Sequence, residues 1–365
     1  MSLLTLHSIS KLFGATAAVD NISINVERGE FFGLLGPSGC GKTTTLRIIA
    51  GLEVPDSGSV AFDGREITNL PPEHRGFGMV FQNYALFPHL NVFENVAFGL
   101  RARRVSNGSD TERIKIKDRV NQALDLVQLS GFDERRVDQL SGGQQQRVAI
   151  ARAIAIEPSL LLFDEPLSNL DVALREETRG ELRALVKRLN LTAVYVTHDQ
   201  EEAFALCDRI AVMDHGRVLQ VDGPRELYDQ PANVTIAEFL GRNNLIRAMR
   251  LTSSSDSVTK FKTLEGGHTL IVNANHDQLM QLPVNKPCLL AIRPEAITIS
   301  KDNSAFENQL PARVEQIEFS GATTTVTLDA DGLKLEALVL RTDLSVDLDC
   351  VLTLPPDRIT LLREN

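Results

Sequence analysis

Short apolar runs alternate with helical patterns over the first two thirds of the chain. Residues 29–36 (GEFFGLLG), 159–165 (SLLLFDE) and 192–198 (TAVYVTH) are apolar enough to be buried strands, and residues 42–51 (KTTTLRIIAG) have the pattern of a helix that ends at a glycine. Side chains also recur at helical spacing at Leu174, Thr178, Leu182, Leu185 and Leu189. This alternation predicts a mainly parallel sheet covered by helices.

Two further segments of this region carry weaker patterns. Residues 22–35 (ISINVERGEFFGLL) contain a turn between two apolar stretches, which predicts an antiparallel hairpin. Residues 101–119 are charged and at first lack an apolar face. We therefore expect a surface loop that enters a helix, with its charges solvated.

The pattern changes after about residue 241. Residues 252–257 (TSSSDS) predict a polar loop, and residues 324–340 alternate on both sides of an Asp-Gly pair, which is a strong hairpin signal. Residues 288–300 predict a strand pair that an Arg-Pro pair interrupts. The tail is therefore expected to be a small, barrel-like all-β domain.

Composition is that of an ordinary globular protein, and a length of 365 residues allows two or three domains. The net charge of −10 gives a nucleic-acid partner no electrostatic support. The four cysteines are scattered without a CxxC pair, which argues against a zinc site and suits a reducing cytoplasm. We expect neither a membrane span nor a signal peptide, because no apolar run reaches about 18 residues and the first residues lack a leader pattern.

Residues 36–44 (GPSGCGKTT), which we name the phosphate loop, follow a predicted strand and open a predicted helix. They match the pattern G-x-x-x-x-G-K-[ST] at Gly36, Gly41, Lys42 and Thr43. Glycines let backbone N–H groups turn towards phosphate oxygens, and the start of a helix adds partial positive charge. The lysine can reach the β- and γ-phosphates and the threonine can ligate Mg²⁺. The alternative is a glycine-rich turn with a chance lysine; the dinucleotide pattern G-x-G-x-x-G does not match.

Cys40 lies inside the phosphate loop. We interpret it as a small residue that the loop tolerates. The alternative is a redox switch that blocks nucleotide binding, which would follow from the exposure expected near the start of a helix.

Polar side chains follow two of the predicted strands. Asp164 and Glu165 end one apolar run, and His198 ends the next. Strand ends of a parallel sheet meet in a ligand crevice, where Asp164 can hold Mg²⁺ and Glu165 can accept a proton from water. Together with the phosphate loop, this predicts hydrolysis of a nucleoside triphosphate. For His198 we favour a contact with the γ-phosphate over a purely structural role.

With these motifs in place, the sequence resembles the ATPase subunits of ABC transporters. Residues 140–144 (LSGGQ), the signature loop, are the most specific feature. Gln82 resembles the Q-loop glutamine that senses Mg²⁺ and water, and residues 168–171 (SNLD) resemble the D-loop. Phe13 resembles the aromatic residue that stacks on adenine, although a place in the core is equally open. The motifs that carry the resemblance span Phe13 to His198, and sequence similar to that of the family continues to about residue 241.

Motifs and resemblance together give the candidate site for ATP and Mg²⁺. The catalytic candidates are Glu165, His198 and Gln82, and the Mg²⁺ ligands are Thr43, Gln82 and Asp164. The nucleotide-binding candidates are Phe13, Gly36, Pro37, Ser38, Gly39, Cys40, Gly41, Lys42, Thr43, Thr44, Ser141, Gly142, Gly143, Gln144 and Asp171.

The resemblance also implies the fold class: an α/β P-loop NTPase followed by a small all-β, OB-like (TOBE-type) domain. Its nucleotide-binding domain is expected over residues 1–240, with a RecA-like core, an antiparallel β subdomain and a helical subdomain at about 83–157. Residues 241–365 would form the C-terminal domain, which in the sugar, polyamine, ferric iron and sulfate importers mediates dimer contacts and regulation.

The family mechanism assigns a role to the signature loop. Two subunits pack head to tail, and the signature loop of one faces the γ-phosphate held by the phosphate loop of the other. We therefore expect a homodimer at the cytoplasmic face of the inner membrane.

The homodimer would contact permease subunits near residues 84–90. For the apolar side chains of this segment we favour an exposed groove over a place in the buried core. A solute-binding protein would be an indirect partner. Ferric iron, polyamine and a sulfate-like oxyanion are the solute candidates.

Three other classes fit less well. A soluble ABC ATPase of DNA repair or translation would carry coiled coils or two ATPase halves, and the acidic charge disfavours nucleic acid. A P-loop kinase or GTPase would lack LSGGQ, and the guanine motif N-K-x-D does not occur. A purely regulatory nucleotide-binding module would not need both Glu165 and His198.

Overall fold

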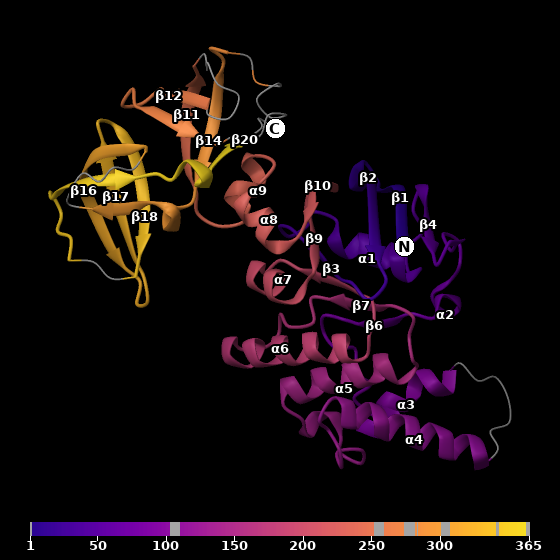
Figure 1. The fold of residues 1–365 in the computed structure, drawn as a ribbon. Helices are drawn as coiled ribbons and strands as arrows, with labels where there is room; N and C mark the ends of the chain where they lie inside the picture. Colours follow the sequence, from indigo (N-terminus) through magenta and orange to yellow (C-terminus); the bar gives the residue numbers. More distant parts are fainter. Residues whose placement is uncertain are drawn as a thin grey trace. The chain divides into compact units, whose positions relative to one another are not determined.

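The structure is a computed structural model, and it describes residues 2–102, 110–251, 259–273, 282, 284–300, 307–340 and 343–362. The chain divides into two compact units, Met1–Pro224 and Arg225–Asn365 (Figure 1). The contacts thus divide the chain before the boundary near residue 240 that the resemblance implies. That boundary and the limits of the helical subdomain stay predictions.

A six-stranded sheet forms the centre of the first unit, in the order β10-β9-β3-β8-β7-β6. Its strands are β3 (Phe31–Leu35), β6 (Gly78–Val80), β7 (Leu161–Asp164), β8 (Ala193–Thr197), β9 (Arg209–Asp214) and β10 (Arg217–Asp222). All neighbours pair in parallel except β10, which is antiparallel to β9. The predicted parallel sheet is therefore confirmed. Strands β3 and β8 are buried along their whole length, because helices cover both faces of such a sheet.

A second, antiparallel sheet has the order β2-β1-β4-β5. It comprises β1 (Ser2–Phe13), β2 (Thr16–Glu27), β4 (Ser57–Phe62) and β5 (Arg65–Glu66). The hairpin predicted for residues 22–35 is wrong, since β2 pairs with β1 while β3 joins the central sheet. The burial patterns give the reason: the later half of β2 alternates buried and exposed side chains, whereas β3 is buried on both faces.

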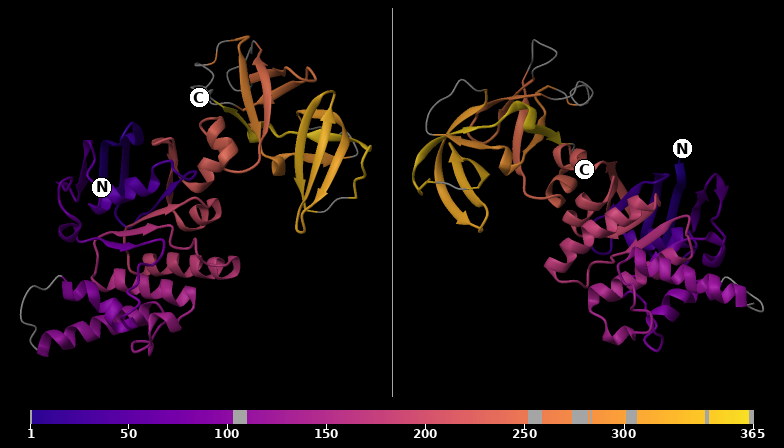
Figure 2. Two further views of the ribbon diagram at one scale, coloured as in Figure 1. Left: turned by 180° about the vertical axis from the view of Figure 1, so that it is seen from behind. Right: turned by 60° about the horizontal axis from the view of Figure 1, so that its bottom comes forward.

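Helices fill the rest of the first unit. They are α1 (Lys42–Ala50), α2 (Pro72–Arg75), α3 (Val92–Ala102), α4 (Asp110–Leu126), α5 (Gly142–Ala155), α6 (Val172–Arg188) and α7 (Gln200–Leu206). Helix α1 packs between the two sheets in one apolar core. It ends at Gly51, as predicted, and Gly51 has the left-handed conformation. Helices α3, α4 and α5 pack on one another, at the opposite end of this unit from β1 and β2 (Figures 1 and 2).

The charged segment at residues 101–119 is partly described. Arg101 and Ala102 still belong to α3, and α4 begins at Asp110, so the predicted entry into a helix is confirmed. Residues 103–109 lie outside the described residues, as do residues 252–257 of the predicted polar loop. Within the described part of the chain, no helix has the length and apolar character needed to cross a membrane.

The second unit is built from short helices and two antiparallel five-stranded sheets, in the orders β13-β12-β11-β14-β20 and β15-β19-β16-β17-β18. The helices are α8 (Pro224–Asp229) and α9 (Val234–Phe239). The strands are β11 (Asn244–Arg250), β12 (Thr259–Thr263), β13 (Thr269–Val272), β14 (Pro287–Ile292), β15 (Thr298–Ser300), β16 (Gln309–Phe319), β17 (Thr324–Ala330), β18 (Leu333–Val339), β19 (Asp349–Thr353) and β20 (Ile359–Leu362).

Both sheets of the second unit contribute to one apolar core, which includes Phe261 and Leu290 from the first sheet and Leu328 from the second. The predicted hairpin is confirmed: β17 and β18 pair across Asp331 and Gly332, which both have positive φ. The strand pair predicted at residues 288–300 is wrong. Strands β14 and β15 exist, but they pair with strands of different sheets, because the chain turns at the Arg-Pro pair instead of folding back.

Candidate nucleotide site

The site lies where three neighbouring central strands end. In the parallel register Leu35 of β3 pairs with Thr197 of β8, and Asp164 of β7 pairs with Val196. The phosphate loop, Glu165 and His198 directly follow these ends, so they open onto one edge of the sheet, as parallel strands require.

Two glycines of the phosphate loop have no room for a side chain. A Cβ on Gly36 would lie 2.2 Å from the carbonyl oxygen of Met213, and one on Gly41 would lie 2.2 Å from that of Ala18. Gly41 also has a φ of 102°, a conformation that costs other residues strain. The loop is therefore fixed in its curve before α1, while Pro37, Ser38 and Gly39 in its middle are exposed.

Lys42 is the first residue of α1, and only 4% of it is exposed. Its Nζ donates to the carbonyl oxygens of Gly36, at 2.8 Å, and Pro37, at 2.9 Å. The ammonium is thus held across the curve of the loop by weak, neutral acceptors. A phosphate oxygen would be a stronger, charged acceptor for the same group.

The premise of a redox switch at Cys40 is wrong. The side chain is buried, with 3% exposed, because it points behind the loop towards Gly36 and not outwards. Burial raises the pKa of the Cys40 thiol, although the Lys42 ammonium opposes this effect. A buried thiol with a raised pKa is a poor nucleophile, so Cys40 packs as a small side chain.

Two of the predicted Mg²⁺ ligands are in contact. The Thr43 hydroxyl donates to Oδ1 of Asp164 at 3.1 Å. Burial raises the pKa of the Asp164 carboxyl, and the Thr43 hydrogen bond opposes that shift. The described residues contain no group of three or more His, Cys, Asp or Glu arranged to hold a metal ion. A hydroxyl and one carboxylate fit Mg²⁺, which takes its remaining ligands from water and nucleotide phosphates.

Glu165 lies at the centre of the three predicted catalytic residues. Its Oε2 is 3.1 Å from Nδ1 of His198 and 3.5 Å from Nε2 of Gln82. A positive φ of 45° turns the backbone at Glu165, and its N–H donates to Val196 of β8 at 3.1 Å. The backbone thus leaves β7 sharply enough to place the carboxylate between the ends of β6 and β8.

Asn169 is a residue of this site that the sequence did not reveal. Its Nδ2 donates to the backbone oxygen of Gln82 at 2.9 Å and to Oδ1 of Asn83 at 3.2 Å. It therefore ties the D-loop to the segment that carries Gln82. The signal was present in the motif SNLD, but the motif alone does not say which of its side chains makes the contact.

The signature loop has a local structure of its own. Ser141 caps α5, its Oγ accepting from the Gln144 N–H at 3.4 Å, while Gln144 Oε1 accepts from the Ser141 N–H at 3.1 Å. This capping box leaves Ser141 and Gly142 exposed, whereas Gly143 packs on Leu174. Among the described residues, the side-chain hydrogen bonds of Ser141 and Gln144 join these two residues to each other and to no residue of the phosphate loop. Asp171 likewise caps α6, accepting from the Leu174 N–H at 2.9 Å.

Phe13 ends β1, and 52% of it is exposed. The alternative of a core position is therefore wrong. The Lys11 ammonium lies 5.5 Å from the centre of the Phe13 ring. An exposed ring beside a cation fits a stacking role, which stays a prediction.

The segment after Gln82 is only partly the groove expected from the sequence. Tyr84 is buried, with 6% exposed, so it cannot offer a docking face. Tyr84 and Ala85 both have positive φ, and Arg152 of α5 donates to their carbonyl oxygens at 2.7 and 2.6 Å. Phe87 is half-buried against Phe98, with ring centres 4.4 Å apart. Within residues 84–90, the exposed residues are Ala85, Pro88 and His89.

Comparison with known proteins identifies both units. The ABC transporter family model matches residues 19–168, and a TOBE domain model matches residues 290–362. The chain is 45% identical to the spermidine/putrescine import ATP-binding protein PotA of Legionella pneumophila (strain Paris), over 91% of this chain and 88% of that protein. It is 44% identical to the sulfate/thiosulfate import ATP-binding protein CysA 2 of Chromobacterium violaceum, over 93% and 87%.

A third relative is the Fe(3+) ions import ATP-binding protein FbpC of Escherichia coli O157:H7, which is 41% identical over 94% of this chain and 92% of its own. Among solved structures, a dimeric ATP-binding cassette in a post-hydrolysis state, bound to ADP and Pi, is 34% identical with a TM-score of 0.53. The match covers 61% of this chain and 99% of that one.

These likenesses cover nearly the whole chain, and they agree with the P-loop sheet of the first unit and the curled antiparallel sheets of the second. The fold class, the family and the ATPase activity predicted from the motifs are therefore confirmed. The chain belongs to the ABC transporter family, as an ATP-hydrolysing, ATP-binding subunit of the import type with a C-terminal TOBE domain.

Proposed function

We propose that this chain hydrolyses ATP with Glu165 as the base that activates water, in sites that a second copy completes. The observation that carries the proposal is the carboxylate oxygen that His198 and Gln82 share, at 3.1 and 3.5 Å. A carboxylate held between two polar side chains at the sheet edge can accept a proton from a water that they orient.

The other residues bind and orient the nucleotide. Lys42 would exchange its two carbonyl partners for phosphate oxygens, and the phosphate-loop N–H groups at the start of α1 would hold the same phosphates. Thr43 and Asp164 would hold Mg²⁺, with Gln82 beside them; when bound, the ion neutralises developing charge on the phosphates. Phe13 would stack on the adenine ring.

The signature loop and Asp171 are proposed to act in trans, on the nucleotide of the partner subunit in a head-to-tail homodimer. Ser141, Gly142, Gly143 and Gln144 open α5, whose start is a favourable place for a γ-phosphate. The exposure of Ser141 and Gly142 supports this role. A two-fold pair would contain two such composite sites.

One experiment separates action in trans from action in cis. Ser141→Arg would be compared with wild type in a Glu165→Gln background, which stops hydrolysis and preserves the bound ATP. We expect unchanged ATP binding by the monomer but loss of the ATP-dependent dimer in analytical ultracentrifugation. Loss of monomer binding would mean that the signature loop acts in cis. The proposal would also be contradicted if the double variant formed an ATP-dependent dimer as stable as that of Glu165→Gln with Ser141 intact.

We further propose that closure and reopening of this dimer drive solute uptake through a separate permease at the cytoplasmic face of the inner membrane, with a solute-binding protein as indirect partner. A spermidine/putrescine, a sulfate/thiosulfate and a ferric iron importer subunit are similar to this chain at 41–45% identity. A polyamine, a sulfate-like oxyanion and ferric iron are therefore the proposed solute classes. The ATPase itself need not contact the solute.

The docking surface is proposed at Pro88, His89 and the exposed side of Phe98, of which 46% is accessible. Because Tyr84 is buried, Tyr84→Ala would test stability instead of docking. We expect His89→Asp with Phe98→Asp to weaken assembly with the permease and leave ATP binding unchanged. Wild-type assembly by that double variant would place the permease contact elsewhere.

A further inference from the structure

We propose that Arg175 is a positioning residue that links the D-loop to His198. The inference rests on the role proposed above for His198 in hydrolysis. Nothing in the sequence motifs singles out Arg175, which lies on α6 one turn after Asp171 and has the spacing of an ordinary charged helix residue.

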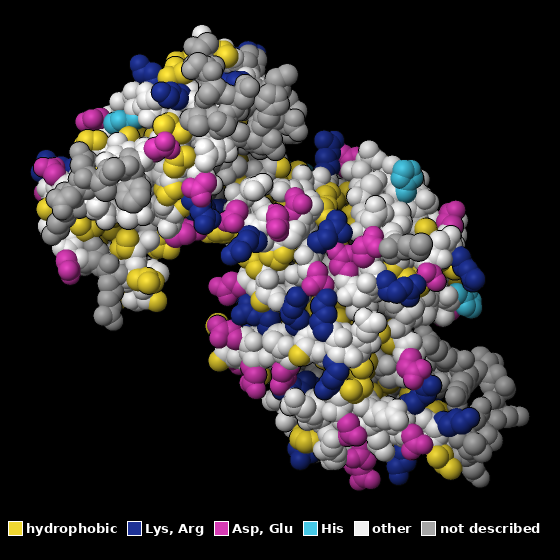
Figure 3. All heavy atoms as spheres, viewed as in Figure 1, with side chains coloured by type: hydrophobic (Ala, Val, Ile, Leu, Met, Phe, Trp, Pro, Cys, Tyr) yellow, Lys and Arg dark blue, Asp and Glu magenta, His cyan; other side chains and the backbone are white. Residues whose placement is uncertain are grey.

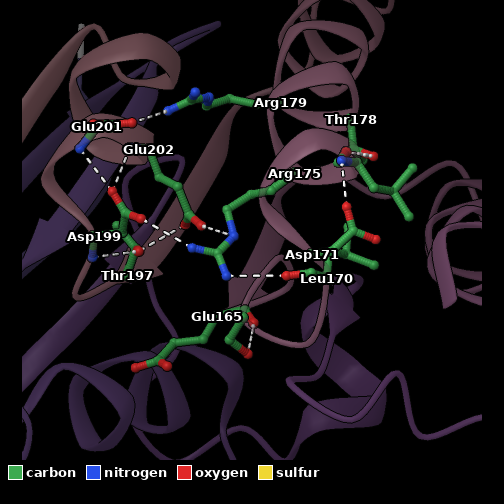
Figure 4. A network of polar contacts seen from close by, with 12 residues as sticks. Glu165, Leu170, Asp171, Arg175, Thr178, Arg179, Thr197, Asp199, Glu201 and Glu202 are labelled. Carbon is green, nitrogen blue, oxygen red and sulfur yellow. Dashed lines mark hydrogen bonds and ion pairs between the residues drawn. The ribbon is translucent and has the colours of Figure 1, made fainter. Parts of the chain in front are cut away.

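Arg175 reaches two separate parts of the site (Figure 4). Its Nη2 donates to the carbonyl oxygen of Leu170 in the D-loop at 3.1 Å. Its Nη1 donates to Oδ2 of Asp199 at 3.3 Å, and its Nε lies 3.8 Å from Oε1 of Glu202. A guanidinium can do this because its donors fan out in one plane, which an ammonium cannot reproduce.

The acidic partners of Arg175 hold the residue before His198. Glu202 is buried, with 3% exposed, and its Oε2 accepts from the Thr197 hydroxyl at 2.8 Å and the Tyr195 hydroxyl at 2.9 Å. Burial raises the pKa of the Glu202 carboxyl, while both hydroxyl hydrogen bonds and the Arg175 charge oppose that shift. Removal of Arg175 would leave this carboxyl buried without its cation, which is costly.

Asp199 is the residue directly after His198, and its own contacts hold it in place. Its Oδ1 accepts from the N–H groups of Glu201 and Glu202, at 2.8 and 3.2 Å, and so caps α7. Its own N–H donates to the Thr197 hydroxyl at 3.0 Å. His198 is thus flanked on both sides by residues that the Arg175 network holds. The His198 ring itself is half exposed, at 53%, and depends on its backbone for its place beside Glu165.

The network supplies a route from the partner subunit to the catalytic residues. The D-loop is proposed to face the second copy, and a shift of Leu170 would be passed to Asp199 and Glu202 through a single guanidinium. Among the described residues the Arg175 Nε has no hydrogen-bond partner. A movement of about 1 Å would turn its ion pair with Glu202 into a direct hydrogen bond.

The test compares three variants of the full chain, assayed for ATP hydrolysis at saturating Mg²⁺. We expect Arg175→Met to lower kcat by about 10- to 100-fold, as displacement of a catalytic group does, with KM for ATP changed by less than about twofold. The kcat of Arg175→Lys should be intermediate, since lysine keeps the positive charge but lacks the planar set of donors of the guanidinium. The control is Arg179→Met, which removes a 3.7 Å ion pair to the exposed Glu201 one turn along the same helix and should match wild type.

Thr197→Val removes one hydroxyl of the network and guards against misfolding of Arg175→Met. It should show the same selective loss of kcat on a smaller scale. If both variants bind ATP normally and hydrolyse it at the rate of Arg179→Met, the inference is wrong. An equal loss in Arg179→Met would likewise make the effect general to α6.

A double-mutant comparison separates this inference from the proposed function. In a His198→Ala background, Arg175→Met should cause less than about twofold further loss, because the residue it positions is gone. A full loss in that background would overturn the link to His198. If His198→Ala alone retains the wild-type rate, the role proposed for His198 in hydrolysis fails, whatever Arg175 does.

Discussion

Oε2 of Glu165 lies 3.1 Å from Nδ1 of His198, and the two residues directly follow adjacent parallel strands, β7 and β8. The pairing is a consequence of strand register, because Asp164 lies opposite Val196 near the ends of the two strands, and Glu165 and His198 are the first residues after them. The same carboxylate oxygen is 3.5 Å from the Gln82 amide. A change that moves the segment carrying Gln82 or the segment carrying His198 should therefore displace the carboxylate of Glu165, the proposed base.

Asn169 provides a first prediction, because its amide donates to the Gln82 backbone at 2.9 Å. We expect Asn169→Ala to lower kcat about 10-fold with little effect on KM, since Gln82 would lose its support from the D-loop. Asn169→Asp is the matched variant: it keeps the size and loses the donor, so it should be impaired to a similar degree. Phosphate release at steady state measures both, and a wild-type kcat for Asn169→Asp would contradict the assignment.

Thiol reactivity gives a second prediction. All four cysteines are buried thiols, and burial raises the pKa values of Cys40, Cys207 and Cys350. A raised pKa lowers the thiolate fraction at any given pH, so labelling of the folded protein should stay slow as pH rises through the ordinary thiol range of about 8 to 9. The unfolded chain should label rapidly over that range.

Kinetics of a chromogenic disulfide reagent, with and without denaturant, would test this expectation. Mass spectrometry would identify the site of any fast reaction. If Cys40 reacted rapidly in the folded protein and MgATP blocked that reaction, its thiol would be exposed in the phosphate loop, which would contradict the structure.

Stability gives a third prediction, on two adjacent glutamines of α5. Gln146 is fully buried, and neither its Nε2 nor its Oε1 has a hydrogen-bond partner among the described residues. Gln145 instead donates to the carbonyl oxygens of Val137 and Leu140, at 3.1 and 3.3 Å. Because an unpaired buried amide is destabilising, Gln146→Met should raise the free energy of unfolding by about 1 kcal/mol, and Gln145→Met should lower it by a similar amount.

Urea unfolding of the two variants would measure these changes against wild type. The opposite signs make the comparison internally controlled, since both substitutions place the same side chain on the same helix. A fall in stability for Gln146→Met would mean that its amide is satisfied in solution.

The motifs predicted from the sequence are those with a strictly local structural cause. Gly41 needs its positive φ and its close approach to Ala18, and the Asp331–Gly332 turn needs two positive φ angles. The residue types in the local motif therefore identify both positions. The sheet-edge residues Asp164, Glu165 and His198 were predictable because each ends an apolar run in a parallel sheet.

The errors concern partners that are distant in sequence. A turn at Gly29 is compatible with a hairpin, and only the full burial of β3 shows that the chain passes to another sheet. The expectation that Cys40 and Tyr84 are exposed failed because their burial is set by Gly36 behind the loop and by the positive φ at Tyr84. Arg175 was missed because its spacing on α6 is that of a solvated charge, while its partners lie on α7.

The rate of ATP hydrolysis by Glu165→Gln, measured beside wild type as single-turnover phosphate release, tests the central claim most directly. The substitution keeps the side chain's size and its contacts to His198 and Gln82 while removing the basic oxygen. We predict a fall of about 10²- to 10⁴-fold, with the affinity for ATP unchanged. Hydrolysis by Glu165→Gln at the wild-type rate would contradict the assignment of Glu165 as the base.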